Sequence, residues 1–234
     1  MNPLRVVLVG HGKMGKLVAE LAPHYKCEVV GVIDPQSPSH GGAPDAAHWD
    51  DVDVAIDFST AEAVEANVVA LARRGINLVI GTTGWQTSEP AIRQAVTAAK
   101  IGAVVAPNFS TGVVLFEAIA AHAAALFARQ PDFGAYVHEA HHAAKMDAPS
   151  GTALLLKRSM EQAGYERAID VSATRAGFIP GTHTIGFDGP AETVILTHSA
   201  RDRTAFARGA LQAAHWIRGK SGWYSMRDVL GLTS

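Results

Sequence analysis

Short apolar runs alternate with amphipathic segments through the first half of the chain. Each run ends in glycine or a small polar residue, which is the pattern of buried parallel strands; the runs are Leu4–Gly10, Cys27–Asp34, Val52–Ser59, Ile76–Gly84 and Ala103–Ser110. Helical spacing lies between most of them, at 13–25, 61–75 and 88–102, whereas 35–49 is rich in Pro, Gly and Ser and predicts a loop. This alternation predicts an α/β fold, a Rossmann-type doubly wound parallel sheet.

The pattern changes after Asn108. A long helix (112–130), a strand (133–142) and a second helix (150–164) lead into three predicted strands with glycine turns, at 170–177, 181–189 and 192–200. Consecutive short strands of this kind favour a smaller α+β domain with a mainly antiparallel open sheet. We therefore expect a dinucleotide-binding domain over 1–109 and 203–234, the latter including a terminal helix, and a substrate-binding and oligomerisation domain over 110–202.

Composition narrows the class of protein. The 234 residues are 48% hydrophobic and 18% charged, which is typical of a folded globular chain, and the formal net charge of −2 gives no basic surface for nucleic acid. No apolar run is long enough for a membrane span, and the N-terminus enters a strand without a secretory signal pattern. The single cysteine, Cys27, excludes a disulfide framework within the chain. We expect a cytoplasmic protein.

The segment Gly10-His-Gly-Lys-Met-Gly15 follows the first strand and opens a helix. In such a context Gly10 permits a tight turn, Gly12 lets a pyrophosphate approach the backbone, and Gly15 allows close packing of helix on strand. The helix start adds N–H groups and the positive end of its dipole. The alternative is an ordinary glycine-rich turn; the context favours a dinucleotide site.

Asp34 ends the second strand and is placed to bind ribose hydroxyls. Its carboxylate repels a 2′-phosphate, and Pro35 and Gln36 follow it without an adjacent arginine, which favours NADH over NADPH, although Lys13 could attract a phosphate. The strand ends at 81–84 and 106–110 share the same sheet edge, which favours contacts to nicotinamide. The predicted cofactor residues are Gly10, His11, Gly12, Lys13, Met14, Gly15, Asp34, Gly81, Thr82, Thr83, Ala106, Pro107, Asn108 and Phe109.

The segment His138–Ala153, HEAHHAAKMDAPSGTA, concentrates histidines, carboxylates and a lysine. A metal site is disfavoured, because adjacent histidines on a strand point to opposite faces and Lys145 would repel a cation. The second half predicts a helix start with Ser150 as N-cap, which offers backbone N–H groups to a carboxylate. With His141 and Lys145 beside it, the segment predicts a site for a small dianionic acid, and a solvated polar loop is the alternative.

Glu139–Ala153 resembles the signature of the dihydrodipicolinate reductase family, the lysine-pathway enzymes also called 4-hydroxy-tetrahydrodipicolinate reductases. It meets every fixed position of the pattern E-[AL]-H-H-x-x-K-x-D-A-P-S-G-T-A. The resemblance continues in family order through nearly the whole chain, which looks like the compact form of the family. The segments that carry it are GHGKMG, VAIDFS, GTTG, APNFS, RAG, GTHT, ILTHSARDRTAFARGA and GWYSMRDVL.

The resemblance implies roles for particular residues. His141 would be the acid/base histidine and Lys145 the proton donor. The substrate-binding residues would be His142 and Arg175 together with Gly151 and Thr152, which hold a carboxylate at the helix start. It also implies a cofactor, NADH or NADPH, and a homotetramer built through the open sheet. His138, His183 and His198 are expected to be structural or to line the sheet.

The resulting hypothesis is hydride transfer from a nicotinamide to a cyclic imine carrying two carboxylates, with Lys145 or His141 supplying the proton. Two alternatives remain open from the residues alone. One is another two-domain nicotinamide oxidoreductase acting on a different small acid. The other is a dinucleotide sensor whose second domain binds a partner, although a sensor does not need the basic cluster at the helix start.

Overall fold

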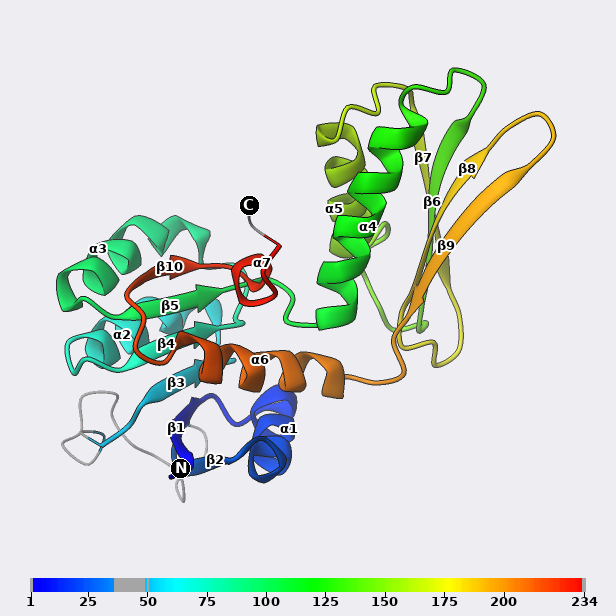
Figure 1. Cartoon of the computed structure of the whole chain (residues 1–234). Helices are drawn as coiled ribbons and strands as arrows, with labels where there is room; N and C mark the ends of the chain where they lie inside the picture. The colour runs from blue at the N-terminus through cyan, green and yellow to red at the C-terminus, as the bar shows by residue number, and fades with distance from the viewer. Residues whose placement is uncertain (1, 36–48, 50, 233–234) are drawn as a thin grey trace. The chain divides into compact units, whose positions relative to one another are not determined.

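The structure is a computed structural model that describes residues 2–35, 49 and 51–232. Most of the loop predicted at 35–49, and Gln36 within it, lies outside the described residues. The chain divides into two compact units (Figure 1): the first comprises Met1–Thr111 and Thr204–Ser234, and the second comprises Gly112–Arg203. In the described part of the chain, no helix is long and apolar enough to cross a membrane.

The first unit contains a six-stranded parallel sheet with the order β10-β5-β4-β3-β1-β2. The predicted doubly wound sheet is confirmed, because the strand order reverses at β1 and β3, where such sheets bind ligands. The sequence had not predicted the sixth strand, β10, which pairs with β5 at the edge. The strands are β1 (Leu4–Val9), β2 (Cys27–Ile33), β3 (Val54–Asp57), β4 (Asn77–Ile80), β5 (Gly102–Val105) and β10 (Gly222–Tyr224).

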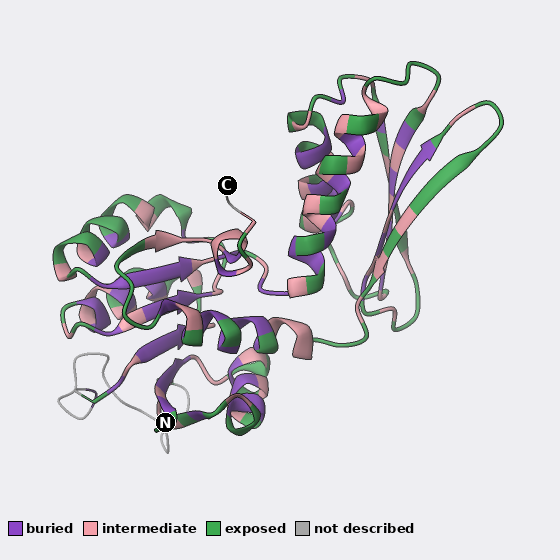
Figure 2. Ribbon diagram, in the orientation of Figure 1, coloured by how far each residue is buried: buried purple, intermediate pink, exposed green. Residues whose placement is uncertain are grey.

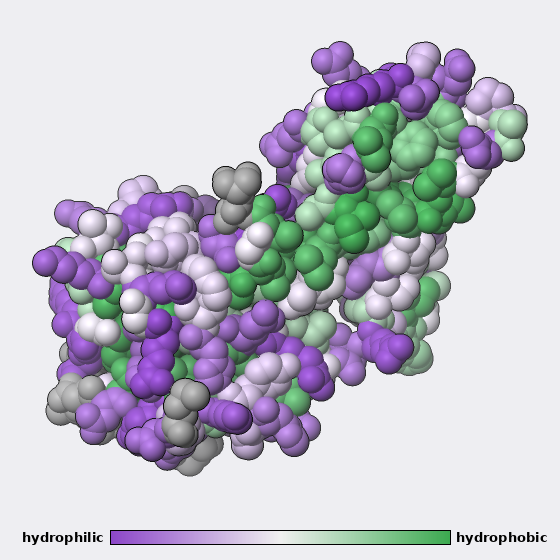
Figure 3. All heavy atoms as spheres, in the orientation of Figure 1, coloured by the Kyte–Doolittle hydropathy of each residue, from purple (hydrophilic) through white to green (hydrophobic). Residues whose placement is uncertain are grey.

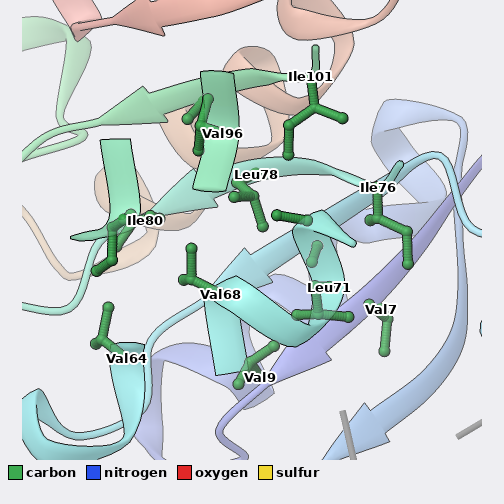
Figure 4. Packing of buried hydrophobic residues seen from close by; sticks show 14 of the residues in the cluster. Val7, Val9, Val64, Val68, Leu71, Ile76, Leu78, Ile80, Val96 and Ile101 are labelled. Atoms are coloured by element: carbon green, nitrogen blue, oxygen red, sulfur yellow. The ribbon is translucent and has the colours of Figure 1, made fainter. Parts of the chain in front are cut away.

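Helices cover both faces of this sheet (Figure 1). One face packs against α2 and α3, and side chains such as Val68, Leu71 and Val96 meet Val9 and Leu78 of the strands in a continuous apolar core (Figure 4). The other face carries α1 and α6. The helices of this unit are α1 (Lys13–Leu21), α2 (Ala61–Ala72), α3 (Glu89–Ala99), α6 (Thr204–Ile217) and α7 (Met226–Val229), with short 3-10 turns η1 (Ala22–Tyr25) and η3 (Gln86–Ser88).

The second unit is built on a four-stranded mixed sheet with the order β7-β6-β8-β9. Its strands are β6 (Gly134–His141), β7 (Ile169–Arg175), β8 (Thr182–Asp188) and β9 (Thr193–Ser199). The predicted α+β unit is confirmed, and two of the three strand pairs are antiparallel. Strand β6 lies between β7 and β8 and pairs with β7 in parallel, a strand order that the sequence pattern did not predict.

Helices α4 (Thr111–Phe127) and α5 (Gly151–Gln162) cover one face of the second sheet (Figure 1). Phe116 and Leu156 from these helices pack with Val137, Ile185 and Phe187 from the strands. The edge strand β9 is exposed along most of its length (Figure 2).

Helix α4 is apolar on more than one side. Phe116 and Ala120 enter the core of the second unit, whereas Leu115, Ile119 and Leu126 are exposed. Hydrophobic residues accordingly gather over α4 on the surface (Figure 3). A helix that is hydrophobic all round is typical of an element covered on several sides, so α4 presents an apolar face beyond its own core.

Candidate functional site

The glycine loop of the first unit has the geometry of a backbone cradle. Gly10 has a φ of +88°, and a Cβ there would lie 2.6 Å from the carbonyl oxygen of Phe58. A Cβ on Gly15 would lie 2.1 Å from the carbonyl oxygen of Gly10, whereas a Cβ on Gly12 would meet nothing within 4 Å. Gly10 and Gly15 are therefore required by packing, and Gly12 faces open space at the start of α1.

Two clefts adjoin this loop. One, of about 510 Å³, is lined by Gly12, Lys13, Met14, Gly81, Thr82 and Thr83, together with Phe58–Ala61. The other, of about 250 Å³, is lined by Gly10, His11, Gly12, Asp34 and Pro35, together with Phe58–Thr60. The larger cleft lies at the carboxyl ends of β1, β3 and β4, and the smaller one at those of β1, β2 and β3. Sheets of this order bind ligands at these strand ends.

Asp34 closes the smaller cleft against the loop. Its carboxylate accepts a hydrogen bond from the backbone N–H of His11 at 2.7 Å. This contact joins the end of β2 to the glycine loop, so Asp34 is held at the rim where a ribose would lie beside a pyrophosphate. The residues present therefore fit a dinucleotide: an open glycine cradle, a helix N-terminus and a fixed carboxylate.

Asp57 is a residue of this site that the sequence analysis missed. Its buried carboxylate accepts hydrogen bonds from the backbone N–H and hydroxyl of Ser59 and from the hydroxyl of Thr82. Burial raises the pKa of Asp57, and the bonds from Ser59 and Thr82 lower it by less. Asp57 thus ties together the loops after β3 and β4. Its position at the carboxyl end of a strand could have identified it in the sequence. The same holds for Phe58–Thr60, which follow that strand and line both clefts.

The segment Ala106–Phe109 follows β5 at the same edge of the sheet. Phe109 is buried and packs edge-on against Phe58, with ring centroids 6.1 Å apart, and Asn108 accepts the N–H of Ser110 through its side chain at 2.8 Å. Helix α6 approaches so closely that a Cβ on Gly209 would lie 1.7 Å from the carbonyl oxygen of Phe109. Gly209 is a second residue the sequence analysis missed, because its partner is distant in sequence.

In the second unit, the end of β6 carries a buried hydrogen-bonded group of side chains. Glu139, which is fully buried, accepts a very short hydrogen bond from Nδ1 of His141. Its two oxygens also accept bonds of 3.0 and 2.6 Å from the guanidinium of Arg175 on β7. His141 and Arg175 are register partners on the parallel strands, which explains their proximity.

The start of α5 joins the same group. The backbone N–H of Ser150 donates to Glu139 at 3.1 Å, and the Ser150 hydroxyl accepts the N–H of Ala153, so the predicted N-cap is confirmed. His183 on β8 lies 3.3 Å from that hydroxyl through Nε2 and stacks edge-on against His141, with ring centroids 5.1 Å apart. His183 is therefore part of the buried group.

Lys145 lies in the loop between β6 and α5. Its ammonium forms an ion pair of 2.6 Å with Asp147, and this hydrogen bond lowers the pKa of Asp147. The N–H of Gly151 also bonds to Asp147, whereas Thr152 and His142 are partly exposed nearby in sequence.

The electrostatics of the buried group keep its histidines neutral. Burial lowers the pKa of His141, the bond to Glu139 raises it, and the charges of Lys145 and Arg175 lower it further. Burial also lowers the pKa of His183 to about 4. Burial alone would raise the pKa of Glu139, but hydrogen bonds from Arg175, His141 and Ser150 together lower it, so it is a carboxylate.

Three of these side chains lie close enough together to bind a metal ion. Ligand atoms of Glu139, His141 and His183 all lie within 4.8 Å of one another. However, Arg175 already supplies the positive charge that Glu139 requires, and a cation would lie beside its guanidinium. The chemistry of the set favours a buried ion pair with neutral histidines, so we derive no metal role from it.

The structure brings most predicted site residues together within their own unit. The glycine loop, Asp34 and Gly81–Thr83 line the clefts of the first unit. In the second unit His141 and Arg175 share the buried group, and Lys145 and Gly151 both contact Asp147. The guanidinium of Arg175 is engaged by Glu139 and by the carbonyl groups of Thr174 and Asp147, which a purely substrate-binding residue would not require.

Comparison with known proteins agrees with this architecture. Residues 4–109 match the model of the dihydrodipicolinate reductase N-terminus, and residues 112–230 match that of its C-terminus. A 4-hydroxy-tetrahydrodipicolinate reductase of Rhodopseudomonas palustris is 36% identical, with 99% of this chain and 98% of the relative covered. One of Methanocorpusculum labreanum is 38% identical, with 98% and 100% covered.

A solved structure has the same fold. Dipicolinate-bound dihydrodipicolinate reductase from a Paenisporosarcina species superposes with a TM-score of 0.79 at 22% identity, covering 95% of this chain and 97% of that one. The two family models together span both units, and the relatives match nearly the full length of the chain. On these grounds the chain belongs to the dihydrodipicolinate reductase family.

Proposed function

We propose that this protein is a 4-hydroxy-tetrahydrodipicolinate reductase, which reduces a cyclic imine carrying two carboxylates to tetrahydrodipicolinate in the diaminopimelate and lysine pathway. Family membership supports the activity, since the relatives carry that name. The observation that carries the proposal is the capped start of α5 beside Lys145 and His141, a basic corner suited to a dicarboxylate. The related structure binds dipicolinate, a dicarboxylate.

The first unit would hold the cofactor. The start of α1, with the glycine loop Gly10–Gly15, would bind the pyrophosphate, and Asp34 would bind the ribose. The strand ends at 81–83 and 106–109 would line the nicotinamide half, and Asp57 keeps the first of these segments in place through Thr82. When bound, NAD(P)H supplies the hydride.

The second unit would hold the substrate. Gly151 and Thr152 at the start of α5 would hold one carboxylate through N–H groups and the helix dipole. Asp147 accepts the N–H of Gly151, which indicates that this N–H suits a carboxylate oxygen. His142 would contact the other carboxylate, and Lys145, released from Asp147, would add positive charge. Arg175 lies beside this site in an ion pair with Glu139 and donates to the carbonyl group of Asp147.

Lys145 is assigned as the proton donor and His141 as the neutral acid/base partner. Burial and the neighbouring cations lower the pKa of His141, so its ring carries no spare proton at neutral pH. Lys145 holds its proton in an ion pair with an exposed carboxylate, which a substrate can displace. General acid catalysis of this kind contributes roughly a hundredfold or more to the rate.

The test is oxidation of NADH and NADPH in a coupled mixture of pyruvate, aspartate semialdehyde and the upstream synthase. We expect turnover by the wild type and a fall in kcat of roughly a hundredfold or more for Lys145→Ala, with cofactor affinity unchanged. Lys157→Ala is the matched control, since it removes a lysine of the same unit whose ion pair, with Glu161, lies within α5. No absorbance change with either cofactor contradicts the function; wild-type kcat in Lys145→Ala contradicts the donor assignment.

We assign NADH as the preferred cofactor. The Asp34 carboxylate, fixed by His11, would repel a 2′-phosphate, whereas it can accept a bond from a 2′-hydroxyl. Lys13, which lines the neighbouring cleft, would attract a 2′-phosphate and so favour NADPH. The ratio of kcat/KM for the two cofactors measures the balance, and a preference for NADPH would contradict the assignment.

We further propose a cytoplasmic homotetramer assembled through the sheet of the second unit. The edge strand β9 exposes Val194 and Ile195, and the sheet has helices on one face only. A reducing compartment suits a chain whose single cysteine, Cys27, is a free buried thiol. Light scattering should give about four times the chain mass of 24.6 kDa, falling for Ile195→Asp. A monomeric wild type contradicts the assembly.

A further inference from the structure

The least explained feature of the second unit is the position of Glu139. It is completely buried, yet it carries a charge, and no part of the proposed chemistry uses it. Burying an ionised carboxylate is costly unless it is paired and hydrogen-bonded. Its four polar contacts come from three different elements: His141 on its own strand, Arg175 on β7, which donates twice, and the backbone of Ser150 at α5.

These contacts place Glu139 between the two halves of the proposed substrate site. The bond from Nδ1 fixes the ring of His141, so Nε2 is its remaining nitrogen. A Cβ on Gly181 would lie 3.0 Å from that Nε2, and glycine leaves the space empty. The bond from the Ser150 N–H holds the residue that caps α5. The Glu139 carboxylate therefore fixes the position of both the His141 ring and the start of α5.

Arg175 completes the arrangement by neutralising Glu139. Its guanidinium donates to both carboxylate oxygens of Glu139 in a bidentate ion pair, which is stronger than a single hydrogen bond between neutral groups. The same guanidinium donates to the carbonyl group of Asp147 in the loop that carries Lys145. Burial lowers the pKa of His141, and the charges of Lys145 and Arg175 lower it further, so the ring is neutral and Glu139 acts mainly as a hydrogen-bond acceptor.

We propose that Glu139 is the positioning residue of the substrate site: it orients His141 and anchors the start of α5, and Arg175 balances its charge. This inference rests on the proposed function for its catalytic consequence. The Glu139 carboxylate also affects the pKa of the His141 ring, which can be measured without substrate. The other charged or titratable groups around this ring are Lys145 in the next loop, Arg175 on β7 and His183 on β8.

The test is Glu139→Gln in the full-length protein, which keeps the shape of the side chain and removes its charge. Glu117→Gln is the matched control, because Glu117 also accepts a side-chain hydrogen bond, from Ser159 at 2.7 Å, on α4 of the same unit. The pKa of the His141 ring is followed by NMR titration without ligand. We expect it to fall in Glu139→Gln and to stay at the wild-type value in Glu117→Gln, since the carboxylate raises this pKa.

The kinetic counterpart is a fall in kcat of roughly a hundredfold in Glu139→Gln, with cofactor affinity unchanged. If the unpaired guanidinium prevents folding, Glu139→Gln combined with Arg175→Met removes both charges and takes the same titration. A His141 pKa equal to that of the wild type in a folded variant without the Glu139 carboxylate overturns the proposal. The ring titration needs no substrate, so it still decides the role of Glu139 if the wild type fails to turn over.

Discussion

The glycine loop of the first unit presents backbone to its cleft, whereas the His141 site of the second unit presents side chains held by a buried network. In the loop, Gly10, Gly12 and Gly15 act through the absence of a Cβ: Gly10 approaches Phe58 after β3, Gly15 approaches Gly10, and Gly12 faces open space. At the second site, Glu139 draws its partners from β6, β7 and α5. A backbone site depends on local sterics, and a side-chain site depends on register.

The comparison also separates how each site tolerates change. A cradle made of glycine fails when volume is added to it, because nothing in a close-packed strand–helix contact can move away. A charged network fails when one member is removed, since the partner left behind remains buried and unpaired. Substitutions that add volume to the loop or remove one charge from the network test this difference between the two sites.

The largest expected effect is at Gly15. In Gly15→Ala the new methyl group meets the Gly10 carbonyl, which is backbone, so α1 must shift. We expect a loss of about 3 kcal/mol in unfolding free energy and a weakened affinity for NADH. Gly12→Ala is the control: its methyl group has open space, so its Tm should equal that of the wild type while NADH binds roughly tenfold more weakly.

Denaturant unfolding and titration with NADH measure the two quantities for each variant. If Gly12→Ala binds NADH as tightly as the wild type does, the cradle is structural only. If Gly15→Ala is as stable as the wild type, the close approach of α1 to the first strand does not constrain this loop.

An intermediate effect is expected from His183 as pH falls. Burial lowers the pKa of His183 from 6.5 to about 4, so between these values the unfolded chain binds a proton that the folded chain does not. Stability is therefore full above pH 6.5 and is lost as the pH falls towards 4, by roughly 2 kcal/mol between pH 7 and pH 5 for this group. His183→Asn should lose correspondingly less.

Urea unfolding at the two pH values measures the difference, with His122→Asn as the control on an exposed face of α4. Burial also lowers the pKa of His141 and of His198, and both remain in the variant, so part of the acid sensitivity persists. An equal loss of stability in His183→Asn and the wild type would mean that His183 does not carry this sensitivity.

The smallest expected effect concerns the cap of α5. The hydroxyl of Ser150 accepts the N–H of Ala153, so Ser150→Ala should cost about 1 kcal/mol. Ser88 occupies the corresponding place before α3, but its side chain makes no capping bond, so Ser88→Ala should cost less. Equal losses of Tm in the two variants would show that the cap bond at α5 adds no stability.

Much of the first unit could be predicted from local sequence patterns. Apolar runs that end in glycine or a small polar residue located β1 to β5, and the glycine spacing after the first run located the cradle. The cap at Ser150 was equally local. Strand β10, however, has only three residues and is defined by its pairing with β5, so it is too short to show a periodic pattern in the sequence.

The contacts between segments distant in sequence could be established only from the folded structure. The placement of β6 between β7 and β8 put His141 opposite Arg175, and the sequence pattern could not distinguish that order from a simple antiparallel run. The same holds for Asp57 with Thr82 and for Gly209 beneath Phe109. A propensity describes a residue and its neighbours along the chain, whereas hydrogen bonds and close approaches between strands depend on register, which only the assembled sheet fixes.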